Sequence, residues 1–200
     1  VRQVGRLCLA FCAAATSLGR ARSMASWTAI TDSLFELGDW LPDLPEERVE
    51  ILRRTMAHHG STNVRPIDLF ENDLPNGWIL DGGAHKVIGV FNWNTNAALK
   101  VEYPFSFAGL DSSKTYVGWD FWRNEPVRPF SGTFRLEVPA DDCRVIALAE
   151  VRKGEKVLVS TSRHVTSPIF DKLNPCAAKI PGETTVCRFY SEDKGFEVSE

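Results

Sequence analysis

The sequence predicts an α+β fold in which a short helix–strand–helix segment precedes an antiparallel β-sandwich. Residues 19–60 contain two stretches with helical spacing on either side of one short apolar run. Residues 61–77 contain two prolines and no long periodic stretch. From Trp78 onward, short runs of alternating apolar and polar residues are separated by turn residues, as an antiparallel sandwich requires.

The first element after residue 18 is expected to be an amphipathic helix over residues 21–31. Its apolar residues fall at helical spacing with polar residues between them: Ala21, Met24, Ala25, Trp27 and Ile30. The polar face is expected to consist of Arg22, Ser23, Ser26 and Thr28. Residues 33–37 then form a short, mostly apolar run that stops at Gly38 and Asp39, which is typical of a buried parallel strand that opens into a loop.

The second helix carries the clearest end signals in the chain. Asp43 precedes Glu46 by three residues, which predicts a capping box at the helix start. The expected inward stripe is Val49, Leu52 and Met56. Basic residues collect before Gly60, where the helix dipole favours cations and glycine can end the helix: Arg53, Arg54, His58 and His59.

The order of these elements divides the chain into four parts. Residues 1–18 form an uncertain N-terminus, and residues 19–60 have the helix–strand–helix rhythm of a (β/α)8 barrel, although only one and a half units of it. Residues 61–77 are expected to be a linker, and residues 78–200 the sandwich.

Within the sandwich, two strands alternate cleanly between apolar and polar positions. They are expected at residues 99–103 and 134–138, each with one buried and one wet face. The runs at 87–93 and 145–149 are apolar on both sides, so we place them centrally or under the barrel contact. Further strands are expected at 156–160 and 184–190, separated by a looser segment with three prolines.

The N-terminus and the cysteines leave the cellular compartment open. Residues 1–17 have basic residues, an apolar run and then small residues, which is the outline of a secretory signal, but we favour a truncated or misassigned start, so the location is cytoplasmic or secreted. No later run approaches the ~20 apolar residues of a membrane span. Cys176 and Cys187 could pair in an oxidising compartment, whereas Cys143 is expected to be a buried hydrophobe.

Composition argues against several function classes. A formal net charge of -3 without a dense basic run gives no field for a polyanion, so we expect no nucleic-acid partner. The sequence has no glycine-rich phosphate loop and no nucleophile elbow. His58 and His59 have no further ligand at a useful spacing, so we expect neither a metal nor a cofactor.

Five segments, in order, resemble the α-galactosidases and their relatives, a clan of glycoside hydrolases that includes families 36 and 27. The first has the form of the closing helix–strand–helix of that barrel and reads ARSMASWTAITDSLFELGDWLPDLPEERVEILRR. The others resemble pieces of its C-terminal sandwich: VRPIDLF, VIGVFNWN, YVGWDFW and VLVSTSRHVTSP. Together they run from about Gly19 to Pro168, and no single one of them is specific.

The resemblance implies a retaining mechanism, in which one Asp attacks the anomeric carbon and another protonates the leaving oxygen. These aspartates belong to earlier strands of a barrel that needs ~250 residues, so no catalytic residue is carried over. The expected partner of the parent enzyme is an α-galactoside-like carbohydrate, without a cofactor and without a membrane. A homo-oligomer is left open, as are the sugar and the linkage.

Asp39 is the candidate for substrate contact, because it follows an apolar strand and barrel enzymes place their active site at the C-terminal ends of the strands. The alternative is that Asp39 caps a turn. Asp141 and Asp142 are interpreted as a solvated turn. The parity of Trp93, Trp119 and Phe121 points into the sandwich core, whereas Trp122 has the opposite parity and is expected to face solvent or the barrel interface.

A second function remains beside the hydrolase fragment: a non-catalytic sandwich that binds carbohydrate or a protein partner. Exposed aromatic residues clustered on one sandwich face would favour this binding module. A bare apolar patch on the helix–strand–helix segment would favour the fragment, because the missing barrel would cover it.

Overall fold

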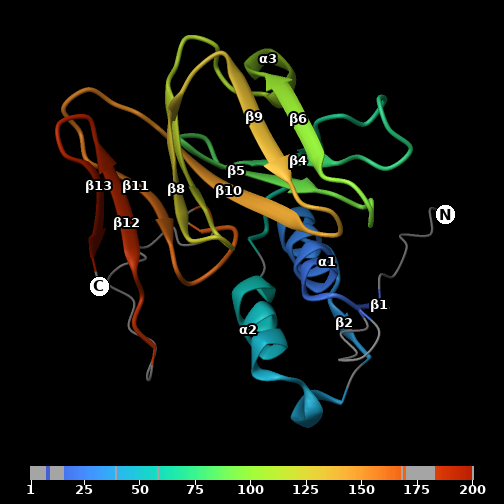
Figure 1. The fold of residues 1–200 in the computed structure, drawn as a ribbon. Helices are drawn as coiled ribbons and strands as arrows, with labels where there is room; N and C mark the ends of the chain where they lie inside the picture. Colours follow the sequence, from blue (N-terminus) through green and yellow to red (C-terminus); the bar gives the residue numbers. More distant parts are fainter. Residues whose placement is uncertain are drawn as a thin grey trace.

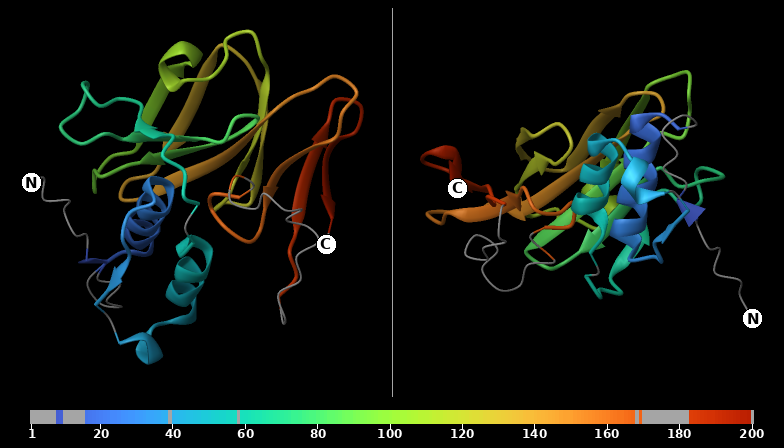
Figure 2. Two further views of the ribbon diagram at one scale, coloured as in Figure 1. Left: turned by 180° about the vertical axis from the view of Figure 1, so that it is seen from behind. Right: turned by 90° about the horizontal axis from the view of Figure 1, so that it is seen from below.

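The fold has three layers, with a large antiparallel sheet in the middle (Figure 1). The computed structural model describes residues 8–9, 16–38, 40–57, 59–167, 169 and 183–199. A two-stranded sheet and a short helix lie on one face of the large sheet, and two helices lie on the other. A small third sheet stands at the side, as both views in Figure 2 show.

The large sheet, called the main sheet below, has six strands in which every neighbouring pair is antiparallel. In spatial order the strands are β3 (Val64–Pro66), β4 (Gly77–Asp81), β5 (His85–Phe91), β10 (Cys143–Glu150), β7 (Tyr116–Asp120) and β8 (Glu125–Phe130). The predicted antiparallel sandwich is thus confirmed. Part of the segment 61–77, which we expected to be a linker, is β3 and extends this sheet.

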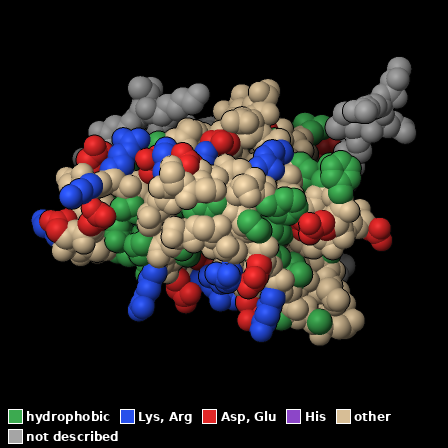
Figure 3. Space-filling model, turned by 90° about the horizontal axis from the view of Figure 1, so that it is seen from above, with side chains coloured by type: hydrophobic (Ala, Val, Ile, Leu, Met, Phe, Trp, Pro, Cys, Tyr) green, Lys and Arg blue, Asp and Glu red, His purple; other side chains and the backbone are tan. Residues whose placement is uncertain are grey.

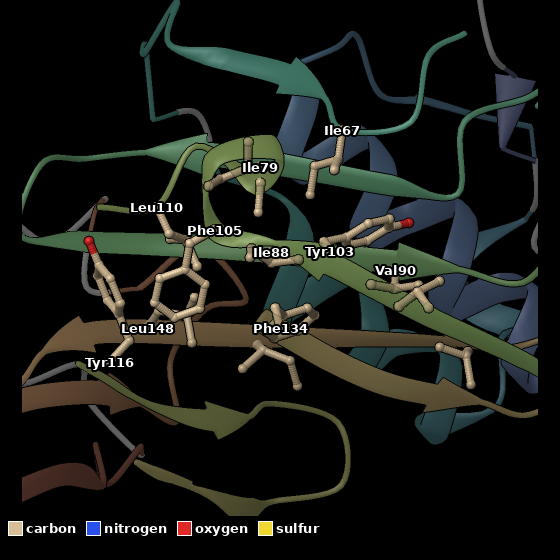
Figure 4. Close-up of a cluster of buried hydrophobic side chains, with 14 residues drawn as sticks. Ile67, Ile79, Ile88, Val90, Tyr103, Phe105, Leu110, Tyr116, Phe134 and Leu148 are labelled. Atoms are coloured by element: carbon tan, nitrogen blue, oxygen red, sulfur yellow. The ribbon is translucent and has the colours of Figure 1, made fainter. Parts of the chain in front are cut away.

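The upper layer is the pair β6 (Leu99–Pro104) and β9 (Thr133–Val138), followed on the β6 side by α3 (Phe105–Ala108). The predicted alternation is confirmed, because Phe134 and Val138 are buried while Arg135 and Glu137 are exposed. The buried side chains meet those of the main sheet in one apolar cluster, in which Phe134 lies near Ile88 and Tyr103 (Figure 4).

The central strands β5 and β10 are covered on both faces, as their apolar runs predict. Ile88 and Val90 face the upper layer, and Val87 and Phe91 pack toward α1 (Leu18–Thr31). At Gly89 the helix comes so close that a Cβ atom would lie 2.5 Å from Cδ1 of Ile30. Glycine is needed here for close approach of the helix to the sheet.

The expected polar face of α1 is wrong, because Ser23, Ser26 and Thr28 are all buried. One side of α1 packs on the main sheet and another packs on α2 (Glu46–Thr55). Small hydroxyls tolerate this burial when they bond to the preceding turn, and Thr28 Oγ1 donates to the carbonyl of Met24 at 2.9 Å.

The predicted capping box of α2 is also wrong. The helix is preceded by Pro45, without a side-chain cap, and Asp43 belongs to a short 3₁₀ helix, η1 (Leu41–Asp43). Glu46 and Glu47 do occupy the first turn, where the helix dipole favours carboxylates. Proline fixes the extended backbone at this point, so the cap position is Pro45, two residues beyond the expected cap at Asp43.

The end and the inward face of α2 differ from the prediction as well. The helix ends at Thr55, not at Gly60, and its buried residues are Arg48, Ile51, Leu52 and Thr55. Met56 is 48% exposed. His59 does act at a helix C-terminus, but that of α1: its Nε2 lies 3.1 Å from the carbonyls of Ala29 and Ile30. His58 lies outside the described residues.

The short strand β2 (Glu36–Leu37) is parallel, as predicted, and pairs with β1 (Cys8–Leu9). It is shorter than the expected strand over 33–37, and Leu34 before it is 58% exposed. Parallel sheets normally have both faces covered by other elements, so an isolated parallel pair of two-residue strands is unusual.

The third sheet consists of β11 (Val157–Thr161), β12 (Cys187–Ser191) and β13 (Gly195–Ser199). It packs on the end of the main sheet through Val159, Tyr190 and Phe196. Cys187 is disulfide-bonded, but Cys176 lies outside the described residues, so their pairing stays a prediction. Cys143 is free and buried, as expected. None of the described helices has the length and apolarity to cross a bilayer.

Candidate functional site

Asp39, the residue predicted to contact substrate, lies outside the described residues, so its role stays a prediction. Its position in the chain is two residues after β2, and the next residue, Trp40, is 72% exposed. The surroundings of this strand end are therefore apolar and open to solvent in the described part of the chain.

The aromatic residues are mainly structural. Trp119 is 6% exposed and meets the ring of Phe196 at 5.6 Å, so it joins the main sheet to the third sheet. Phe121 packs edge-on against Trp122 below the main sheet, with ring centres 5.2 Å apart. Trp122 faces the helical layer, because its indole Nε1 donates to Ser26 Oγ of α1 at 2.8 Å. Of the two alternatives for Trp122, the interface is the observed one.

Trp93 lies just beyond the end of β5 and lines an apolar recess of about 290 Å³. The other walls of the recess are Arg20, Met24 and Trp27 of α1 and Leu74 of the loop before β4. The Trp93 ring stacks on Phe91 at 5.6 Å with an interplanar angle of 16°. The recess therefore offers one flat aromatic wall with a guanidinium beside it.

Arg20 holds this recess in shape. Its Nε donates to Asp141 Oδ1 at 2.5 Å, and its guanidinium carbon lies 5.6 Å from the centre of the Trp93 ring. Asp141 also accepts from Ser17 Oγ at the start of α1. Asp141 lies in the turn between β9 and β10, as interpreted, but its side chain is not simply solvated, since it fixes the first turn of α1 to the sandwich.

Asp68 organises the loop that carries Leu74. This carboxylate is 2% exposed and accepts hydrogen bonds from Gly77 N at 2.9 Å, Tyr103 Oη at 3.0 Å and Asn72 Nδ2 at 3.1 Å. Burial, and then the negative charge of Asp68, raise the pKa of the Tyr103 hydroxyl, which keeps it protonated as a donor. Beyond this anchor the loop is open, and Phe70 is 97% exposed.

The buried carboxylates of the described residues serve the fold. Besides Asp68 there is Asp120, which pairs with Arg144 at 2.5 Å and accepts from Arg123 N at 3.2 Å. Burial raises the pKa of Asp120 while Arg144 opposes the rise. Both carboxylates are buried and held by donors of the protein. In the described ranges, no cluster of three or more His, Cys, Asp or Glu side chains is suited to a metal ion.

Sequence reasoning missed the recess because its walls come from three distant segments. Met24 and Trp27 lie on the expected helix, and Arg20 lies one residue before its expected start, yet nothing in their spacing indicates Leu74 or Trp93 as neighbours. Asp68 carried a weak signal, since an Asp follows Ile67 directly after a proline-terminated strand. Its role depends on Tyr103, which is 35 residues away.

No protein-family model and no curated protein sequence matches the chain. Solved structures do match its fold. α-Galactosidase I from Mortierella vinacea matches with a TM-score of 0.54 and 17% identity, over 66% of this chain and 36% of that one. A GH27 β-L-arabinopyranosidase from Geobacillus stearothermophilus, crystallised with arabinose, matches with a TM-score of 0.54 and 16% identity, over 66% of this chain and 31% of that one. The chain thus has the fold of the C-terminal part of α-galactosidase-like glycoside hydrolases and spans about a third of these structures.

Proposed function

We propose that this chain is the C-terminal portion of a retaining glycoside hydrolase that acts on α-galactosides or related α-glycosides. In this proposal residues 19–60 are the last helix–strand–helix of a (β/α)8 barrel, residues 61–77 connect it, and residues 78–200 are the sandwich that supports the barrel. The likeness to the solved hydrolases supports the fold of this assignment, and the surface of the helical segment supports its role.

The observation that carries the proposal is an apolar surface on the helix–strand–helix segment. Among its residues Leu34 is 58%, Trp40 72%, Leu41 49% and Met56 48% exposed. Exposed apolar groups in this number on one short segment are typical of a surface that another part of a protein covers. The parallel pair β1–β2 points the same way, since parallel strands are normally flanked by further strands and helices.

The alternative, a binding module without chemistry, would need aromatic platforms on the sandwich. In the described part of the sandwich the exposed large aromatics are Phe70 and Phe107, and these lie in the loop before β4 and in α3, not on strands. Seen from above, hydrophobic side chains form separate groups between charges of both signs (Figure 3). This surface supports the hydrolase portion better than a carbohydrate platform.

The chemistry of the parent enzyme would come from two carboxylates ~5 to 5.5 Å apart on the barrel strands. The chain's own contribution would be structural support, with α1 docked on the main sheet through Ile30 at Gly89 and through the Trp122–Ser26 hydrogen bond. Asp39 would extend from the last barrel strand toward the sugar, because active sites of such barrels lie at the C-terminal ends of the strands.

The experiment is an assay of the purified chain on an aryl α-galactoside. We expect no turnover above a buffer control, because positioning alone does not replace the acid and the nucleophile. Turnover that Asp39→Asn abolishes would contradict the absence of catalytic machinery. Specific binding to an immobilised galactoside without turnover would favour the binding module.

A second measurement tests the covered surface directly. A dye that fluoresces on apolar surfaces should bind the chain, and Trp40→Asp with Met56→Lys should remove more than about half of the signal, because both side chains are exposed apolar groups of the helical segment. The matched control is Phe107→Asp, an exposed aromatic on α3 outside the helical segment. An equal loss in both variants would contradict a surface of the helical segment that the barrel covers.

A further inference from the structure

A second recess lies where the helices, the main sheet and the third sheet meet. It is lined by residues of both α2 and β12 and has a volume of about 340 Å³. Its polar walls include Arg22 of α1, Arg54 of α2, Asn124 and Trp122 after β7, Ser162 after β11 and Arg188 of β12. We call it the arginine recess after Arg22, Arg54 and Arg188.

Arg188 is a buried cation without a counter-ion. The residue is 7% exposed, its Nη2 donates to Asn124 Oδ1 at 2.7 Å, and its guanidinium lies over Trp119 at 4.9 Å. Its Nη1 is buried and has no acceptor, and none of the ion pairs in the described part of the chain includes it. Burial, and then the charge of Arg54, lower the pKa of Arg188 to about 10, so it still carries its charge at neutral pH.

Arg22 of α1 also lines the recess and is half-buried. Its guanidinium lies 5.7 Å from the centre of the Trp122 ring, and its Nε is buried without an acceptor. Arg54 differs, because Glu50 binds it at 2.6 Å and Glu183 binds it as well. Glu47 and Glu50 also line the recess from α2. Two of the three arginines thus lack a negative partner among the described residues.

Buried charges in proteins are normally paired, because an unpaired one costs several kcal/mol of desolvation. The guanidinium presents its donors in a planar fork that matches the oxygens of a phosphate or a carboxylate. Ser162 adds a hydroxyl proton, since its oxygen accepts from Val186 N at 2.9 Å and leaves O–H free to donate. The recess also lies within the range of roughly 300–1,000 Å³ that small-molecule sites occupy.

We propose that the arginine recess binds a small oxyanion of the phosphate or carboxylate class, with Arg188 and Arg22 supplying the counter-charge and Asn124 and Ser162 the neutral donors. The bound anion ties the third sheet to the helical segment, because its ligands come from α1, the loop after β7 and β12. This site is independent of the proposed hydrolase chemistry.

The test is thermal unfolding of the full chain at pH 7 in inorganic phosphate, in acetate and in sodium chloride at equal ionic strength. We expect the Tm to rise with phosphate or acetate concentration, as a ligand that binds only the folded state requires, and not with chloride. A response to phosphate alone identifies a tetrahedral oxyanion site, and a response to acetate alone a carboxylate site.

Arg188→Met removes the charge and retains most of the apolar side chain. We expect this variant to keep or raise its Tm in chloride, since an unpaired buried charge is lost, and to bind the anion about 10- to 100-fold more weakly. The control is Arg135→Met, an exposed arginine of β9 that pairs with Glu102 at 2.9 Å. It should keep the full response.

Two results would overturn the proposal: a wild-type Tm that responds to phosphate and acetate no more than to chloride, or an equal response in wild type and Arg188→Met. If Arg188→Met does not fold, Arg22→Gln is the deciding variant, because Arg22 approaches the recess from another element. An unchanged response in Arg22→Gln would then refute the site. None of these results depends on hydrolase activity.

Discussion

The main sheet and the helical segment differ in how far their apolar side chains are buried. In β5, Val87, Ile88 and Val90 are fully buried, because one layer covers each face of the sheet. In the helical segment Leu34 and Trp40 are mostly exposed. The core of the main sheet is therefore covered on both faces, whereas the helical segment leaves several apolar side chains exposed to solvent.

The two helices differ in what they pack against. α1 contributes Ala29 and Ile30 to the cluster beneath the main sheet, so it belongs structurally to the sandwich. α2 is held mainly through α1, by Ile51 and Leu52. α1 therefore packs on both the sandwich and α2, and the end of both helices, where the sequence places the boundary, is not an edge of the packing.

The largest effect is expected from the sandwich core. Phe134→Ala should lower the free energy of unfolding by ~3 to 5 kcal/mol, because a fully buried ring is lost and a cavity remains. The matched control is Glu137→Ala on the same strand, an exposed residue whose nearest cation, Lys100, lies 3.7 Å away, and it should stay within about ±0.5 kcal/mol. Denaturant melts measure both. Equal losses would refute the assignment of faces in β9.

The next effect concerns the contrast between the two helices. Amides of α2 should exchange with solvent at least about tenfold faster than those of α1, because α2 has fewer buried contacts with the sandwich. β5 and β10 are the protected reference. Limited proteolysis should first cut within 61–77, where Phe70 is 97% exposed. Protection of α2 equal to that of β10 would show that the helical segment is stable without a further partner.

The smallest effect is a pH dependence at the third sheet. His85 Nε2 lies 2.8 Å from the Leu158 carbonyl, and burial lowers the pKa of His85 below its usual 6.5, with Arg152 adding to the shift. Below pH 6.5 the unfolded chain therefore binds a proton that the folded chain resists, so stability falls as pH decreases.

Urea midpoints between pH 7.5 and pH 5 measure this dependence. His85→Gln retains a donor and does not titrate, so its midpoint should vary less over the same range. A midpoint that falls as steeply in His85→Gln as in wild type would exclude His85 as the titrating group.

The alternating strands could be predicted from sequence because burial on one face imposes period two, as Phe134 and Glu137 show. The central strands were predicted for the related reason that both faces are covered. The predicted capping box was wrong because the fixed φ of Pro45 keeps the backbone extended there, and a hydrogen bond from the Asp43 side chain does not outweigh that constraint. The predicted polar face of α1 was wrong because serine and threonine side chains can be buried once their hydroxyls donate to backbone carbonyls of their own helix.

The recesses could not be predicted in the same way. A local pattern indicates which face of an element is buried, but not which distant element covers it. Arg188 and Arg22 are 166 positions apart in the sequence, and they line the same recess only because the elements that carry them pack together. Asp39 remains the residue that the sequence predicts to contact substrate.

The absence of a side chain at Gly89 sets the distance between the helical layer and the sandwich. The Ile30 side chain occupies the space that a Cβ atom at position 89 would need, so the helix packs directly on the backbone of Gly89. A larger residue would have to displace the end of the Ile30 side chain and the ring of Phe91, whose Cζ would lie 2.8 Å from the same Cβ atom. A position that binds nothing thus sets how two apolar side chains fit between the helix and the sheet.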